Sequence, residues 1–138
     1  MQIIYIFLIS LLVFGVLDAI WLSGIMAKTY RKSLSSIGKF KEDGSFSPRL
    51  GAVAIVYVSI VLSFMIFVLP KAFILGGLGS FIYGAIFGIL VYAIYEFTNY
   101  AGLKDWPRKL VVLDTLWGGV LFGASSVIVP FIVRLLHI

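Results

Sequence analysis

Apolar residues dominate four long stretches of the chain, and polar and charged residues gather in the segments between them. About 20 consecutive apolar residues are enough for a helix to cross the hydrocarbon core of a bilayer. The pattern therefore predicts transmembrane helices over residues 3–26, 50–69, 75–100 and 107–135, with a polar loop over residues 27–49. The expected fold is all-α, a polytopic membrane protein whose single domain, residues 1–138, is an antiparallel four-helix bundle.

Prolines and an aspartate mark the expected helix ends. Pro70 is expected to end the second helix because proline lacks an amide donor. Asp105 is the expected N-cap of the fourth helix, with Pro107 in its first turn, and Pro130 should kink the far end of that helix. No basic residue precedes the first stretch, which is longer than the apolar core of a signal peptide, so we expect an uncleaved helix.

Composition supports a membrane protein and excludes several classes of enzyme. Of the 138 residues, 62% are hydrophobic and 12% are charged, whereas soluble domains carry about 25% charged residues. The four helices leave little chain for a separate catalytic domain. The chain has no cysteine and one histidine, His137, so it lacks a thiol nucleophile and thiolate metal ligands. The sequence predicts no metal site and identifies no cofactor.

The formal net charge of +5 is distributed unevenly between the two sides of the predicted bundle. The loop 27–49 and the connector before the fourth helix hold Lys28, Arg31, Lys32, Lys39, Lys41, Arg49, Lys104, Arg108 and Lys109. The opposite side holds only Lys71 and Arg134. By the positive-inside rule, both basic segments are cytoplasmic and both termini face outward. The charge thus indicates topology and a lipid partner, not nucleic acid, and the loop binds either anionic lipid or a protein.

Three acids fall inside the predicted helices: Asp18, Glu96 and Asp114. An aspartate at the centre of a membrane helix costs roughly 2.5 kcal/mol or more, and such residues normally face the bundle interior, a partner or water. Helix directions and the rise of about 1.5 Å per residue place all three in the cytoplasmic half. With no Lys or Arg at their depth, they cannot all be ionised comfortably, so we expect a proton shared between Glu96 and Asp114.

One stripe of the third helix is predicted to pack inward. Steps of four and then three residues connect Ser80, Gly84, Gly88, Tyr92, Glu96 and Asn99. The Gly-x-x-x-Gly pair permits close backbone approach in lipid. The short connector makes the third and fourth helices antiparallel neighbours, so Glu96 should approach Asp114 near the cytoplasmic mouth.

A Leu-Asp-x-x-Trp pattern occurs twice, at Asp18 with Trp21 and at Asp114 with Trp117. Residues three apart share a helix face, so an indole N–H can bond a carboxylate and its ring can wall a pocket. The alternative is the interfacial aromatic belt, which suits Trp106 better. An inverted repeat is one explanation of the duplication. The candidate ligand-binding or proton-coupling residues are Asp18, Trp21, Tyr92, Glu96, Asn99, Asp114 and Trp117.

Three ordered motifs carry a resemblance to a family. They are Leu17-Asp18-Ala19-Ile20-Trp21-Leu22, the segment 95–107 with Glu96, Asn99, Trp106 and Pro107, and Asp114-Thr115-Leu116-Trp117-Gly118. Together they resemble a bacterial family of small four-helix inner-membrane proteins known as a domain of unknown function. The likeness spans essentially the whole chain, and Glu96 stands where the family pattern favours aspartate. It implies a multi-pass protein of the bacterial inner (cytoplasmic) membrane and no established activity.

Three functions remain open at the level of sequence. The first is binding or transport of a cationic or proton-coupled small ligand, in an architecture similar to that of the small multidrug exporters, which act as dimers. The second is an enzyme that acts on a lipid headgroup by carboxylate acid–base chemistry, with catalytic residues that the sequence does not identify. The third is a structural or accessory subunit, so that a homodimer or a larger membrane complex is a further expected partner.

Overall fold

The computed structural model describes all 138 residues as a bundle of helices without a sheet; its only β-bridge pairs Phe40 with Phe46. The elements are α1 (Gln2–Ala19), η1 (Ile20–Ile25), α2 (Ala27–Ser33), α3 (Leu50–Ser63), η2 (Phe64–Val68), α4 (Leu69–Leu75), α5 (Gly77–Gly102) and α6 (Arg108–Leu135), of which η1 and η2 are π-helical turns. Four continuous segments are long and apolar enough to span a membrane: Gln2–Ile25, Leu50–Leu75, Gly77–Gly102 and Arg108–Leu135. The all-α polytopic fold is thereby confirmed.

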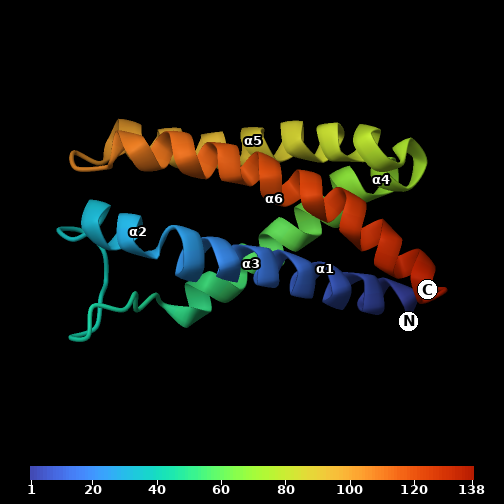
Figure 1. The fold of residues 1–138 in the computed structure, drawn as a ribbon, viewed down its shortest axis with the longest axis horizontal. Helices are drawn as coiled ribbons and strands as arrows, with labels where there is room; N and C mark the ends of the chain where they lie inside the picture. Colours follow the sequence, from blue (N-terminus) through green and yellow to red (C-terminus); the bar gives the residue numbers. More distant parts are fainter.

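Both chain termini lie together at one end of the bundle, which Figure 1 shows beside the start of α1. The opposite end carries α2, the segment 34–49 and the connector 103–107, and we call it the basic end. Helices α5 and α6 form a tightly packed hairpin, α1 lies against α6, and α3 packs on α1. The four spans thus alternate in direction, as the sequence predicted.

Two expected helix boundaries are wrong. The second span does not end at Pro70 but continues to Leu75. Pro70 falls in the first turn of α4, directly after the π-helical turn η2, where a missing amide hydrogen is tolerated. Asp105 makes no capping hydrogen bond: Pro107 occupies the N-cap position of α6, and its carbonyl oxygen accepts from the amides of the first turn. Pro130 lies inside α6, which continues for another five residues to Leu135.

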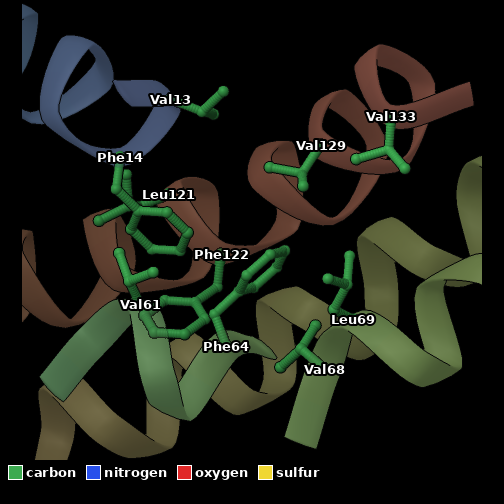
Figure 2. Close-up of a cluster of buried hydrophobic side chains, with 10 residues drawn as sticks. All are labelled: Val13, Phe14, Val61, Phe64, Val68, Leu69, Leu121, Phe122, Val129 and Val133. Atoms are coloured by element: carbon green, nitrogen blue, oxygen red, sulfur yellow. The ribbon is translucent and has the colours of Figure 1, made fainter. Parts of the chain in front are cut away.

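The apolar core occupies the middle of the bundle and the half that carries the termini. Its ten buried residues, drawn in Figure 2, are Val13, Phe14, Val61, Phe64, Val68, Leu69, Leu121, Phe122, Val129 and Val133. The ring of Phe14 meets those of Phe64 and Phe122 edge to face, with centroid distances of 5.2 and 5.0 Å. Such aromatic pairs add about 0.5–1.5 kcal/mol beyond their burial. This core holds α1, α3 and α6 together one turn or more from the acidic residues.

Glycines set the register between α5 and α6. A Cβ atom on Gly84 would lie 2.6 Å from the carbonyl oxygen of Phe122, and one on Gly88 would collide with the carbonyl group of Gly118. Ser126 fixes the same interface by donating from Oγ to the carbonyl oxygen of Ser80 at 2.6 Å. The inward packing predicted for the glycine stripe of α5 is confirmed. The close approach of the two helices brings the C-terminal end of α5, which carries Glu96, against the first turns of α6.

Candidate functional site

The three intramembrane acids are buried between the apolar core and the basic end. Asp18 of α1 is 6% exposed, Glu96 of α5 1% and Asp114 of α6 7%. Asp18 stands at the end of α1, before the π-helical turn η1, and Asp114 stands in the second turn of α6. Glu96 lies two turns from the end of α5. All three side chains are therefore enclosed within the bundle.

Asp18 joins three helices through two hydrogen bonds. One oxygen accepts from the hydroxyl of Tyr57 on α3 at 3.0 Å, and the other accepts from the indole Nε1 of Trp117 on α6 at 2.7 Å. Both donors are partly buried. The carboxyl group therefore anchors the part of the bundle where α3 otherwise has few buried residues.

Asp114 accepts a hydrogen bond from the hydroxyl of Tyr30, which lies on α2 outside the membrane-spanning segments. Burial, and then the bond to Asp114, raise the pKa of Tyr30 well above its usual range. Tyr30 therefore remains a protonated donor at any physiological pH. The Nε1 atom of Trp21 approaches the same carboxyl group but is buried without a hydrogen-bond partner, and so is Oγ1 of Thr115. Nε1 of Trp21, near Asp114, and Oγ1 of Thr115, on the next residue of α6, are thus both unsatisfied.

Glu96 accepts a hydrogen bond of 2.8 Å from Nε1 of Trp106, in the connector between α5 and α6. Its carboxyl group faces that of Asp114 within interaction range, although no hydrogen bond of ordinary geometry joins the two. Tyr92, one turn earlier on α5, packs its ring over Gly118 and faces all three acids. The approach of Glu96 to Asp114 predicted from the short connector is therefore present in the structure.

The side-chain hydrogen-bond donors to the acids are all uncharged. They are two phenols and two indoles, from Tyr30, Tyr57, Trp106 and Trp117. Neutral donors stabilise a buried charge but cannot cancel it, and like charges at close range oppose each other's ionisation. The side chains around the acids therefore offset a negative charge there only in part.

The rings of Trp21 and Trp117 stack in parallel, with centroids 4.5 Å apart and an interplanar angle of 1°. They belong to the two Leu-Asp-x-x-Trp copies: Trp21 lies in η1, directly after α1, and Trp117 lies in α6. Each tryptophan turns toward the aspartate of the other copy: Trp117 bonds Asp18, and Trp21 approaches Asp114. The exchange gives this part of the bundle an approximate local two-fold symmetry, and the rings pack on each other instead of lining a hollow.

Most of the candidate residues converge, and one does not. Tyr92 and the two stacked tryptophans gather with the three acids, whereas Asn99 is partly buried beside Tyr95 of its own helix and makes no hydrogen bond to a carboxylate. Sequence reasoning missed three donors: Tyr30, Tyr57 and Trp106. Tyr57 was detectable, because it precedes Val61, Phe64 and Val68 on one stripe at steps of four, three and four. The sequence pattern favours the aromatic belt for Trp106, and Tyr30 falls within the predicted loop 27–49.

A family model described as a predicted membrane protein, DUF2177, matches residues 3–131 of the chain. No curated protein and no solved structure matches it. The matched region includes every acid and every donor of the site.

Proposed function

As this chain belongs to the DUF2177 family of predicted membrane proteins, we propose that it works within a bilayer as a binding site for small cations, in which its buried carboxyl groups exchange protons for the ligand. The observation that carries the proposal is the meeting of three buried acids whose side-chain donors are all neutral. A proton held between Glu96 and Asp114 supplies the counter-charge while the site is empty, and a bound cation replaces it.

Two further features of the site favour a ligand. Nε1 of Trp21, near Asp114, and Oγ1 of Thr115 on α6 are both buried without partners, which is the condition of groups that a ligand or a water molecule satisfies. Aromatic rings from Trp21, Trp117 and Tyr92 also stand around the acids; because the two indoles stack on each other, only their outer faces are left to attract an organic cation. The acid pair and the aromatic rings together suit an organic cation better than a bare metal ion.

The proposed setting follows from the charge distribution. The basic end of the bundle faces the cytoplasm and the termini face outward, because basic residues concentrate in cytoplasmic segments. The resemblance of the three motifs implies that the membrane is the inner membrane of a bacterium. The acids lie nearest the basic end, so the cation enters from the cytoplasmic side.

The test is to titrate the purified protein with tetraphenylphosphonium and to measure the affinity by isothermal titration calorimetry at a series of pH values from about 5 to 9. If one proton leaves for each cation bound, the affinity for the cation falls about tenfold for each unit by which the pH is lowered in the acid range, by proton linkage. Glu96→Gln and Asp114→Asn should flatten that dependence. Asp105→Asn, in the exposed connector, is the control and should leave it unchanged. Binding independent of pH in the wild type would contradict proton exchange, and wild-type affinity and slope in both acid variants would contradict the site.

The parallel Trp21–Trp117 stack favours a second candidate, a structural lock. In this case the acids hold α1, α3, α5 and α6 together through their neutral donors, and the bundle serves a larger membrane assembly. The two candidates differ in one readout. A lock predicts that Asp114→Asn lowers the melting temperature while tetraphenylphosphonium binds neither protein, whereas the cation site predicts wild-type binding that Asp114→Asn weakens.

A further inference from the structure

A hollow of about 420 Å³ lies at the basic end, between α2 and the first turn of α6. Its lining is Lys28, Thr29, Lys32, Ser33 and Lys109. The hollow contains none of the candidate residues of the acid cluster, and no apolar or acidic side chain lines it. It is therefore a separate site with its own chemistry.

Helical spacing explains how α2 builds most of this lining. Lys28 and Lys32 are four residues apart, as are Thr29 and Ser33, so the helix presents two ammonium groups beside two hydroxyl groups. Lys109 completes the lining from α6. Three like charges around one hollow repel each other unless an anion lies between them. Ammonium and hydroxyl donors together are a common set for phosphate groups.

The anchoring of α2 makes the hollow a preformed feature. Tyr30, between the lining residues on the same helix, donates its hydroxyl hydrogen to Asp114 of α6. This bond holds α2 against the helix that supplies Lys109. A site held rigid before binding loses less entropy when its ligand arrives.

The position of the hollow relative to the four spans favours a lipid as the source of an anion. Lys28 follows the end of the first span at Ile25 by three residues, and Lys109 is the second residue of the fourth span, which starts at Arg108. Both therefore lie at the level where lipid headgroups meet the hydrocarbon core. Juxtamembrane lysines of this kind attract anionic lipids by about 1 kcal/mol each.

We propose that the hollow between α2 and α6 binds a phosphate group, which an anionic phospholipid supplies from the surrounding leaflet. Lys28, Lys32 and Lys109 neutralise the phosphate, while Thr29 and Ser33 donate hydrogen bonds to its oxygens. The proposal is independent of cation binding at the acids, because it rests on other residues and on the opposite charge.

The experiment titrates purified protein in detergent with dioleoylphosphatidylglycerol, dioleoylphosphatidylcholine and, separately, inorganic phosphate, and counts bound molecules by native mass spectrometry. The test variant is Lys28→Gln/Lys32→Gln/Lys109→Gln. The matched control is Lys39→Gln/Lys41→Gln/Lys104→Gln, which removes the same charge from exposed residues that do not line the hollow. Thermal unfolding verifies that each variant is folded.

The wild type should prefer phosphatidylglycerol over phosphatidylcholine by about thirtyfold, which is roughly the attraction of two lysines. The test variant should lose this preference, and the control should keep it. Equal losses in the two triple variants would overturn the site, because binding would then follow total charge. Inorganic phosphate that binds the wild type as tightly as the lipid, and loses affinity only in the test variant, would support the phosphate site and assign it to a soluble anion.

A second variant keeps the net charge and tests the hydroxyl groups alone. Thr29→Val/Ser33→Ala should weaken phosphatidylglycerol binding about tenfold or more, because it removes two hydrogen bonds to a charged phosphate, which are stronger than bonds between neutral groups. This variant also tests the site if the variant that lacks the three lysines fails to fold. Unchanged binding in the folded double variant would count against a phosphate held by this lining.

Discussion

Nε1 of Trp117 donates a 2.7 Å hydrogen bond to Asp18, across 99 residues of sequence. The bond connects the tryptophan of the second Leu-Asp-x-x-Trp copy to the aspartate of the first. The reciprocal contact, from Trp21 to Asp114, stops short of a hydrogen bond, and Asp114 accepts from Tyr30 instead. The local two-fold symmetry is therefore broken at one point, by a residue of α2.

This asymmetry predicts unequal effects of two matched substitutions. Trp117→Phe removes a donor from a buried acid, whereas Trp21→Phe removes an indole N–H that has no partner. Both substitutions remove a similar area of contact between the two stacked rings. Trp117→Phe should lower the free energy of unfolding by about 1 kcal/mol more than Trp21→Phe does. This difference lies between the average contribution of a hydrogen bond in membrane proteins and that of a hydrogen bond to a charged group. Denaturant titration in detergent measures the difference, and equal losses would show that the bond contributes little.

Glycine packing between α5 and α6 predicts a strong positional effect of one methyl group. Gly88→Ala should destabilise the bundle by about 2 kcal/mol, because its Cβ would collide with the Gly118 carbonyl and overpacking costs 1–3 kcal/mol. Gly15→Ala is the matched control: a Cβ there meets nothing within 4 Å, and alanine favours a helix over glycine. Melting temperatures should fall for the first variant and rise slightly for the second. Similar shifts in both would contradict the close approach of α5 and α6.

The bond from Tyr30 predicts that α2 is held by one hydroxyl group. Tyr30→Phe should increase hydrogen–deuterium exchange over residues 27–33, because the helix is only seven residues long and too short to be stable alone. Tyr5→Phe, at an exposed position of α1, should leave that exchange unchanged. Protection of residues 27–33 that does not change in the Tyr30 variant would show that other contacts anchor α2.

The proposed topology is testable in a chain that lacks cysteine. A cysteine placed at Ser36, in the exposed segment after α2, should resist a membrane-impermeant maleimide in intact cells and react after permeabilisation. A cysteine at Gln2 should react in intact cells. The reverse pattern would place the basic end outside and contradict the orientation that the positive-inside rule gives.

The sequence was sufficient to predict the fold and the three buried acids of the site, but not most of their hydrogen-bond donors. Long apolar runs set the four spans, and an ionisable residue inside a span has few options but to face inward, which placed Asp18, Glu96 and Asp114 correctly in the interior. The donors depend on tertiary packing, so the role of Tyr30 could not be read from a short polar loop. The passage of a helix through Pro70 depends on a π-helical turn, which has no simple sequence signal.

The central claim is that a proton resides between Glu96 and Asp114 until a cation displaces it. Infrared spectroscopy of the purified protein at pH 7 measures this directly, through the carbonyl band of a protonated carboxylic acid. The wild type should show this band, and tetraphenylphosphonium should remove it. Glu96→Gln should abolish it, because Asp114 then loses its repelling neighbour and keeps the Tyr30 donor, whereas Asp18→Asn should retain it. A wild-type spectrum with only ionised carboxylate bands at pH 7, or a band that the cation leaves unchanged, would contradict the account.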